Sequence, residues 1–97
     1  MAEVTWTEEA VRWLEDIFEY IAADNPAAAS ETVEKLYERV QVLGQYPEMG
    51  HRFLHSTRNV RILMSGQYRI AYLVKRDGNV DVLGVFHTSL DIDRYQL

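Results

Sequence analysis

Most of the fold can be predicted from the stretch Asn59-Val-Arg-Ile-Leu-Met-Ser-Gly-Gln-Tyr-Arg-Ile-Ala-Tyr-Leu-Val-Lys-Arg-Asp-Gly-Asn-Val-Asp-Val-Leu-Gly-Val-Phe-His87. It is rich in Val, Ile, Tyr and Phe, which favour the pleated, half-buried surface of a β-sheet. Two turn signals, Ser65-Gly66-Gln67 and Asp77-Gly78, divide it. The pattern therefore predicts an antiparallel meander with strands at 60–64, 68–75 and 80–87.

Side chains alternate along a strand, so the meander has two faces. A loop formed by Ser65-Gly66-Gln67 would place Met64 opposite Tyr68. One face would then be an apolar core face holding Val60, Ile62, Met64, Tyr68, Ile70, Tyr72 and Val74. The other would carry Arg61, Leu63, Arg69, Ala71 and Leu73. We therefore expect Arg61 and Arg69 to project from one uncovered face, on which a partner could dock.

The third predicted strand has two possible registers. A tight turn made only by Asp77-Gly78 places His87 on the face of Tyr68. A longer loop that includes Asn79 places His87 beside Arg69 instead, because a one-residue slip exchanges the faces of a strand. The sequence leaves both placements of His87 open.

Two amphipathic helices are predicted to precede the meander, after a short β-type run at 3–6. Thr7 is a suitable N-cap for the first helix, which should end near Ala23. Asn25 and Pro26 fit the cap and first residue of the second helix, and Gly44 fits its C′ position. The apolar stripes are Ala10, Leu14, Ile17, Phe18 and Ile21, then Ala29, Val33, Leu36, Val40 and Leu43. A helical hairpin on one face of the sheet would bury both stripes, which predicts an α+β fold ordered β-α-α-β-β-β.

Length and composition indicate one domain spanning residues 1–97, with a flexible tail at about 89–97. The net charge is −5, divided into −8 for residues 1–50 and +3 for residues 51–97. The chain has no cysteine, so disulfides and thiolate metal sites are excluded. It shows no secretion signal and no apolar run of the ~20 residues that span a bilayer. We expect a cytoplasmic protein with no membrane partner.

Few residues suggest a metal site or a cofactor. His51, His55 and His87 are the possible metal ligands, but Pro47 and Gly50 argue against a helix that would pair the first two. The sequence also lacks a phosphate-binding glycine loop and a Ser/His/Asp nucleophile motif. We therefore predict neither a metal nor a cofactor.

Two groups of side chains could still bind or react. Arg61 and Arg69 could hold carboxylates or phosphates, or could simply keep a solvent-facing sheet soluble. His87 could be a general acid or base. A hydrogen bond from His87 to Asp91, within a tail cluster that includes Arg94 and Tyr95, is the favoured interpretation.

An ordered set of motifs resembles the RelE/ParE superfamily, the toxins of type II toxin–antitoxin pairs. The motifs are Asn25-Pro26-Ala27-Ala28-Ala29, Pro47-x-x-Gly50, Arg61, Tyr68-Arg69-Ile70-Ala71-Tyr72 and His87-x-x-x-Asp91. The resemblance covers nearly the whole chain. It implies a compact α+β fold, with two helices on a twisted antiparallel sheet, and a small antitoxin that wraps and silences the toxin.

The superfamily has two activities. RelE-like members cleave messenger RNA on the ribosome with basic residues and a tyrosine or histidine, whereas ParE-like members poison DNA gyrase. Arg61 and Arg69 match two basic positions of the RelE-like site. However, Leu63 stands where that site has a second lysine, and Thr88 stands near the position of its key arginine. The incomplete basic set, the opening of the second helix and the acidic net charge favour ParE-like members.

The resemblance therefore implies a ParE-like toxin that binds a cognate antitoxin and inhibits gyrase, without catalysis by this chain. The residues expected to contact the antitoxin or the target are Arg61, Leu63, Arg69, Leu73, Asp91 and Arg94. One alternative is a ribosome-dependent messenger-RNA endoribonuclease with Arg61, Arg69, His87 and Tyr95 at its site. Another is an inactive homologue that acts only as a binding module. Direct sequence-specific DNA binding is not expected.

Overall fold

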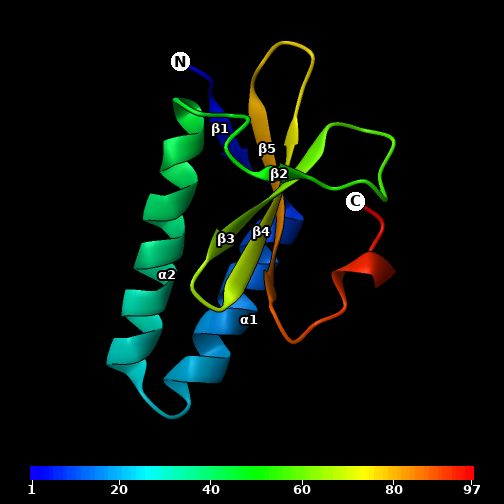
Figure 1. Ribbon diagram of the computed structural model, residues 1–97. Helices are drawn as coiled ribbons and strands as arrows, with labels where there is room; N and C mark the ends of the chain where they lie inside the picture. Colours follow the sequence, from blue (N-terminus) through cyan, green and yellow to red (C-terminus); the bar gives the residue numbers. More distant parts are fainter.

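Two antiparallel helices lie on one face of a twisted sheet in the computed structural model, which describes residues 1–97 (Figure 1). The elements are β1 (Val4–Trp6), α1 (Glu8–Ala22), α2 (Pro26–Gln41), the 3-10 turn η1 (Val42–Gly44), β2 (His51–Arg52), β3 (Val60–Ser65), β4 (Tyr68–Val74), β5 (Val80–His87) and the 3-10 turn η2 (Ile92–Arg94). The strand order is β1-β5-β4-β3-β2. The predicted α+β fold is confirmed, with two differences: β1 pairs parallel to β5, and β2 adds a strand within the predicted loop.

Both helices begin at the residues predicted from the sequence. Thr7 Oγ1 accepts a hydrogen bond from the Ala10 N–H at 3.2 Å, and Asn25 Oδ1 accepts one from the Ala28 N–H at 3.1 Å. The predicted end of the second helix is wrong, because Gly44 closes η1 without a positive φ. Gly44 instead allows a close approach of the N-terminus: its carbonyl accepts the Ala2 N–H at 2.8 Å.

The β3–β4 turn is one residue shorter than predicted. Ser65 pairs with Tyr68, and Gly66 takes a φ of +56° at the first turn position, as glycine does in tight hairpin turns. The shift exchanges the faces of β3 relative to β4. Arg61 now lies opposite Tyr72, and Arg69 lies opposite Met64. The expectation that Arg61 and Arg69 share a face is therefore wrong.

The register of β5 depends on a loop and a bulge. The Lys75 N–H donates to the Asn79 carbonyl at 2.8 Å, so residues 76–78 form the loop, with Gly78 at a φ of +89°. Further along, pairing jumps from Val82 to Gly84, and Leu83 has no partner on β4. The bulge brings His87 opposite Tyr68, which is one of the two placements that the sequence left open.

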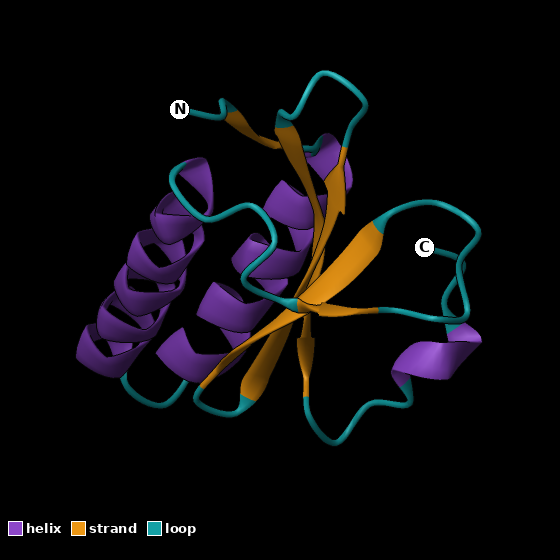
Figure 2. Ribbon diagram, turned by 45° about the horizontal axis from the view of Figure 1, so that its top comes forward, coloured by secondary structure: helices purple, strands orange, loops and turns teal.

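Both faces of the sheet are covered. On the helix side, the buried residues are Ala10, Leu36, Val40, Leu43, Leu63, Ile70, Tyr72, Val80, Val82 and Val85. On the other side, hereafter the tail face, the buried cluster is Phe53, Val60, Ile62, Ala71, Phe86 and Ile92. Figure 2 shows the C-terminal segment with η2 on the side of the sheet away from the helices. The residues predicted to form a tail thus contribute to a second core.

The Tyr95 ring anchors this segment. Its centroid lies 4.8 Å from that of Phe86 and 5.7 Å from that of Trp13, which reaches this side from α1. The Leu97 carbonyl accepts the Ser56 hydroxyl at 2.8 Å. No helix of the chain is both long enough and apolar enough to cross a bilayer.

Candidate functional site

The six predicted docking residues do not form one surface. Arg61 and Leu63 belong to the helix side, where Leu63 is only 3% exposed. Arg69 and Leu73 belong to the tail face, since they pair with β3 residues of that side. Asp91 and Arg94 lie in the exposed C-terminal segment, 3.6 Å apart between Oδ2 and Nε. A single docking face built from all six is therefore excluded in this conformation.

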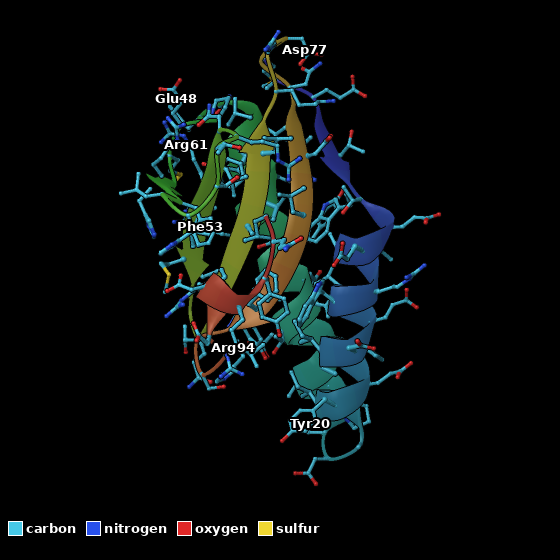
Figure 3. The ribbon with its side chains drawn as sticks, turned by 90° about the vertical axis from the view of Figure 1, so that its right-hand side faces the viewer. Tyr20, Glu48, Phe53, Arg61, Asp77 and Arg94 are labelled. Atoms are coloured by element: carbon cyan, nitrogen blue, oxygen red, sulfur yellow. The ribbon has the colours of Figure 1, made fainter.

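Arg61 fastens the segment before β2 to the sheet. Its Nη1 donates to the carbonyls of Gly50 at 2.8 Å and Glu48 at 3.2 Å. The Gly50 N–H donates to the Tyr72 hydroxyl at 2.8 Å. A Cβ on Gly50 would lie 2.6 Å from the Ile62 carbonyl oxygen, so the approach requires glycine. Figure 3 shows Arg61 and Glu48 together at this edge of the sheet.

The Tyr72 phenol is held in its neutral form. Burial raises the pKa of Tyr72, while the Gly50 hydrogen bond and the Arg61 charge lower it by less. Tyr72 has no exposed surface, so its hydroxyl is available only to Gly50. We name Arg61, Gly50 and Tyr72 the β2 clasp, and its geometry indicates a structural role for Arg61.

Arg69 differs from Arg61 in its surroundings. It lies on the tail face between Met64 of β3 and Phe86 of β5, and it makes no ion pair. Met64 is 44% exposed, so this end of the tail face is open to solvent. Arg69 is therefore the member of the predicted set best placed to meet a partner on that face.

His87 and Tyr68 lie side by side in a groove of about 860 Å³ between the helical pair and the end of the sheet that carries the β3–β4 turn. The groove is lined by Trp13, Asp16, Ile17, Tyr20, Ile21, Thr32, Lys35, Leu36, Ser65, Gly66, Gln67, Tyr68, Val85, His87, Ser89 and Leu90. The Tyr68 and His87 rings meet edge to face, with centroids 5.5 Å apart. Burial raises the pKa of Tyr68.

The hydrogen bonds of His87 correct the predicted pair with Asp91. His87 Nδ1 accepts the Ser89 N–H at 3.1 Å and lies 2.8 Å from the Ser89 hydroxyl. His87 Nε2 lies 3.4 Å from Gln67 Oε1, which suits a neutral ring with its proton on Nε2. Asp91 instead caps η2, where it accepts the Asp93 N–H at 3.2 Å.

The predicted ribonuclease set is not brought together. Arg61 pairs with Tyr72, and His87 pairs with Tyr68. Tyr72 and Tyr68 are four residues apart on β4, so the backbones of Arg61 and His87 are separated by roughly 13 Å along the strand direction. Arg69 and Tyr95 lie on the opposite side of the sheet. The described chain also contains no group of three or more His, Asp or Glu side chains placed to hold a metal ion.

Sequence reasoning missed Arg52 and the clasp tyrosine. Arg52 lies directly opposite Arg61, because β2 pairs with β3. A strand of only two residues carries no alternating pattern that could have revealed it. Pro47 and Gly50 indicate a loop, but the sequence does not show that Arg61 and Tyr72 hold this loop against the sheet.

Comparisons with known sequences agree with this architecture. The chain matches the family described as the ParE toxin of the type II toxin–antitoxin system parDE over residues 4–92. Y4kP of Sinorhizobium fredii, whose name marks it as a candidate toxin, is 36% identical over 85 residues, covering 87% of this chain and 85% of that protein. Toxin RelE2 of Caulobacter vibrioides is 32% identical over 89 residues, covering 92% of this chain and 98% of that protein.

Solved structures share the fold. The chromosomal ParDE toxin–antitoxin system from P. aeruginosa gives a TM-score of 0.75 at 23% identity, covering 90% of this chain and 96% of that chain. The RelBE2 toxin–antitoxin complex from Mycobacterium tuberculosis gives a TM-score of 0.62 at 22% identity, covering 89% of this chain and 96% of that chain. Both solved structures thus share the overall fold of this chain.

Proposed function

This chain belongs to the ParE toxin family of type II toxin–antitoxin systems, and we propose on that premise that a cognate antitoxin silences it and that the free chain inhibits DNA gyrase. The match to the ParE family over residues 4–92 carries the proposal. The scattered positions of Arg61, Arg69, His87 and Tyr95 support it, because a ribonuclease would need such groups around one phosphate.

The ribosome-dependent ribonuclease is the second candidate, since a relative of this chain carries the name RelE2. Induced expression in cells separates the two activities. For a gyrase inhibitor we expect filamentation and gyrase-linked DNA breaks, with no new ends in messages mapped by primer extension. Codon-positioned cuts in messages without DNA breaks would establish the ribonuclease instead. Harmless expression without the antitoxin would indicate an inactive binding module.

For the antitoxin we propose two contact regions. Half of the residues that line the groove beside His87 are hydrophobic, and Tyr20 among them is 85% exposed, so the groove suits the apolar face of an amphipathic helix. Arg69, on the other side of the sheet, suits a carboxylate from the same wrapping partner. Leu73, Asp91 and Arg94 extend that second region, whereas Leu63 is too deeply buried to take part.

Single substitutions test the two regions. Arg69→Ala and Tyr20→Ala should each weaken binding of the antitoxin encoded by the neighbouring reading frame, as measured by calorimetry on the purified proteins. Arg76→Ala, in the exposed loop between β4 and β5, is the matched control. Unchanged affinity in both variants would contradict the proposed contacts while leaving the family assignment intact.

A further inference from the structure

Two arginines face each other at the β2 edge of the sheet. Arg52 of β2 and Arg61 of β3 are direct cross-strand partners. Side chains in such pairs point to the same face with their Cβ atoms about 5 Å apart, and like charges placed there repel. Arg39 of α2 flanks the same segment, with its Nη1 4.0 Å from Met49 Sδ.

No carboxylate lies within ion-pair distance of these three arginines. The chain forms three ion pairs of Lys or Arg and one contact between His55 and Asp93, and none of the four includes Arg39, Arg52 or Arg61. Glu48, the acid nearest to Arg52 and Arg61 in sequence, offers Arg61 its backbone carbonyl. The Arg61 Nε is buried and has no hydrogen-bond partner. This protein carries 15 acidic side chains, so the unneutralised arginines are a local feature and not a consequence of composition.

The position of the pair makes it reachable. Arg52 is exposed, and β2 is the edge strand of the sheet. An edge strand presents free backbone groups to an extended segment of a partner. A guanidinium binds a carboxylate through two parallel hydrogen bonds, so the exposed Arg52 could hold one such group while the Arg61 charge lies beside it.

We propose that Arg52, flanked by the charges of Arg61 and Arg39, binds a carboxylate side chain of an acidic segment of the antitoxin. This inference rests on the proposed function and adds a third contact region to it. The net charge of −5 on the whole chain disfavours a long polyanion such as RNA, whose phosphates would extend beyond the three arginines. A short acidic peptide segment needs to meet only the arginines themselves.

Calorimetry with the antitoxin of the neighbouring reading frame tests the proposal. Arg52→Gln should raise the dissociation constant about tenfold and flatten its dependence on salt. Arg76→Gln, a matched exposed arginine in the β4–β5 loop, should change neither. An Arg52→Gln variant that binds with unchanged affinity and salt dependence would overturn the carboxylate site but not the proposed function.

A second measurement is independent of the antitoxin. The Nε–Hε signals of Arg52 and Arg61 are followed by NMR while oligo-glutamate, oligo-uridylate or inorganic phosphate is added. The proposal requires oligo-glutamate to shift these signals, to a larger extent than the other two and less at high salt. No shift with oligo-glutamate, or a stronger response to oligo-uridylate or phosphate, would overturn it.

Discussion

Arg61 and Arg69 have the same chemistry but different surroundings. The Arg61 guanidinium donates to two backbone carbonyls, whereas Arg69 stands on the opposite face without an ion-pair partner. The sequence shows that both arginines lie among apolar residues of neighbouring strands. It does not show their faces, because these depend on a single residue in the intervening turn.

The stability effects of the two arginines should therefore differ. Arg61→Met leaves the Gly50 and Glu48 carbonyls without their donor and should lower the free energy of unfolding by about 1–3 kcal/mol. Arg69→Met removes no hydrogen bond to a backbone carbonyl and should change the free energy of unfolding by less than about 0.5 kcal/mol. Urea unfolding of both variants measures the difference. Equal effects would contradict the assigned role of the β2 clasp.

Tyr72 should make the fold sensitive to alkali. Burial raises the pKa of the Tyr72 phenol, so the folded state holds this proton more tightly than the unfolded state. The phenol's contribution to stability is complete below about pH 10, its unfolded pKa, and is lost as the pH rises through the folded pKa.

Above about pH 10, the Tyr72→Phe variant should therefore lose unfolding free energy less steeply with pH than the parent chain. The loss that remains in this variant comes from Tyr68, whose pKa is also raised by burial. Tyr20→Phe is the control, because the Tyr20 ring is 85% exposed. Urea unfolding at several pH values provides the slopes. The same slope in the parent and in Tyr72→Phe would show that the buried phenol is not coupled to folding.

At the scale of elements, the helix starts and the positions of the hairpin turns were predictable, but the lengths of the turns were not. Thr7 and Asn25 cap their helices through contacts with residues three positions later, and such local chemistry is visible in a sequence. The β3–β4 turn depends on a positive φ at Gly66, which Ser65-Gly66-Gln67 permits in more than one loop length. The bulge that leaves Leu83 unpaired had only one local signal, the isolated Gly84 that follows it within the strand.

Gly66 should be required for its backbone conformation alone. A Cβ at Gly66 would meet nothing within 4 Å, yet its φ of +56° disfavours other residues. Gly66→Ala should thus cost about 1–2 kcal/mol of unfolding free energy, and Gly66→Asn less, because Asn tolerates this region better. Thermal unfolding of the two variants checks the ranking. A stable Gly66→Ala variant would contradict the two-residue turn, and with it the assignment of faces.

At the scale of the whole molecule, the sheet is a layer between two cores. The helical hairpin on one side was predictable, because its apolar stripes repeat regularly. The second core was not, because Ile92, Tyr95 and Leu97 are separated by polar residues that resemble a solvated tail. Figure 3 shows this segment crossing the sheet on the side away from α2, with Arg94 at its outer surface.

The C-terminal segment should contribute measurably to stability. Ile92 is 7% exposed, so Ile92→Ala should lower the free energy of unfolding by about 2–4 kcal/mol. Leu90→Ala, at a site 36% exposed, should cost clearly less. Guanidinium unfolding of both variants is the measurement. An Ile92→Ala variant as stable as the parent would show that residues 89–97 behave as the flexible tail predicted from the sequence.

Supercoiling of relaxed plasmid by purified gyrase tests the proposed target most directly. With the purified chain added, we expect supercoiling to stop and cleaved DNA to accumulate, and an equimolar amount of the cognate antitoxin should reverse both effects. Uninhibited gyrase at an excess of folded chain, with or without antitoxin, would contradict the account.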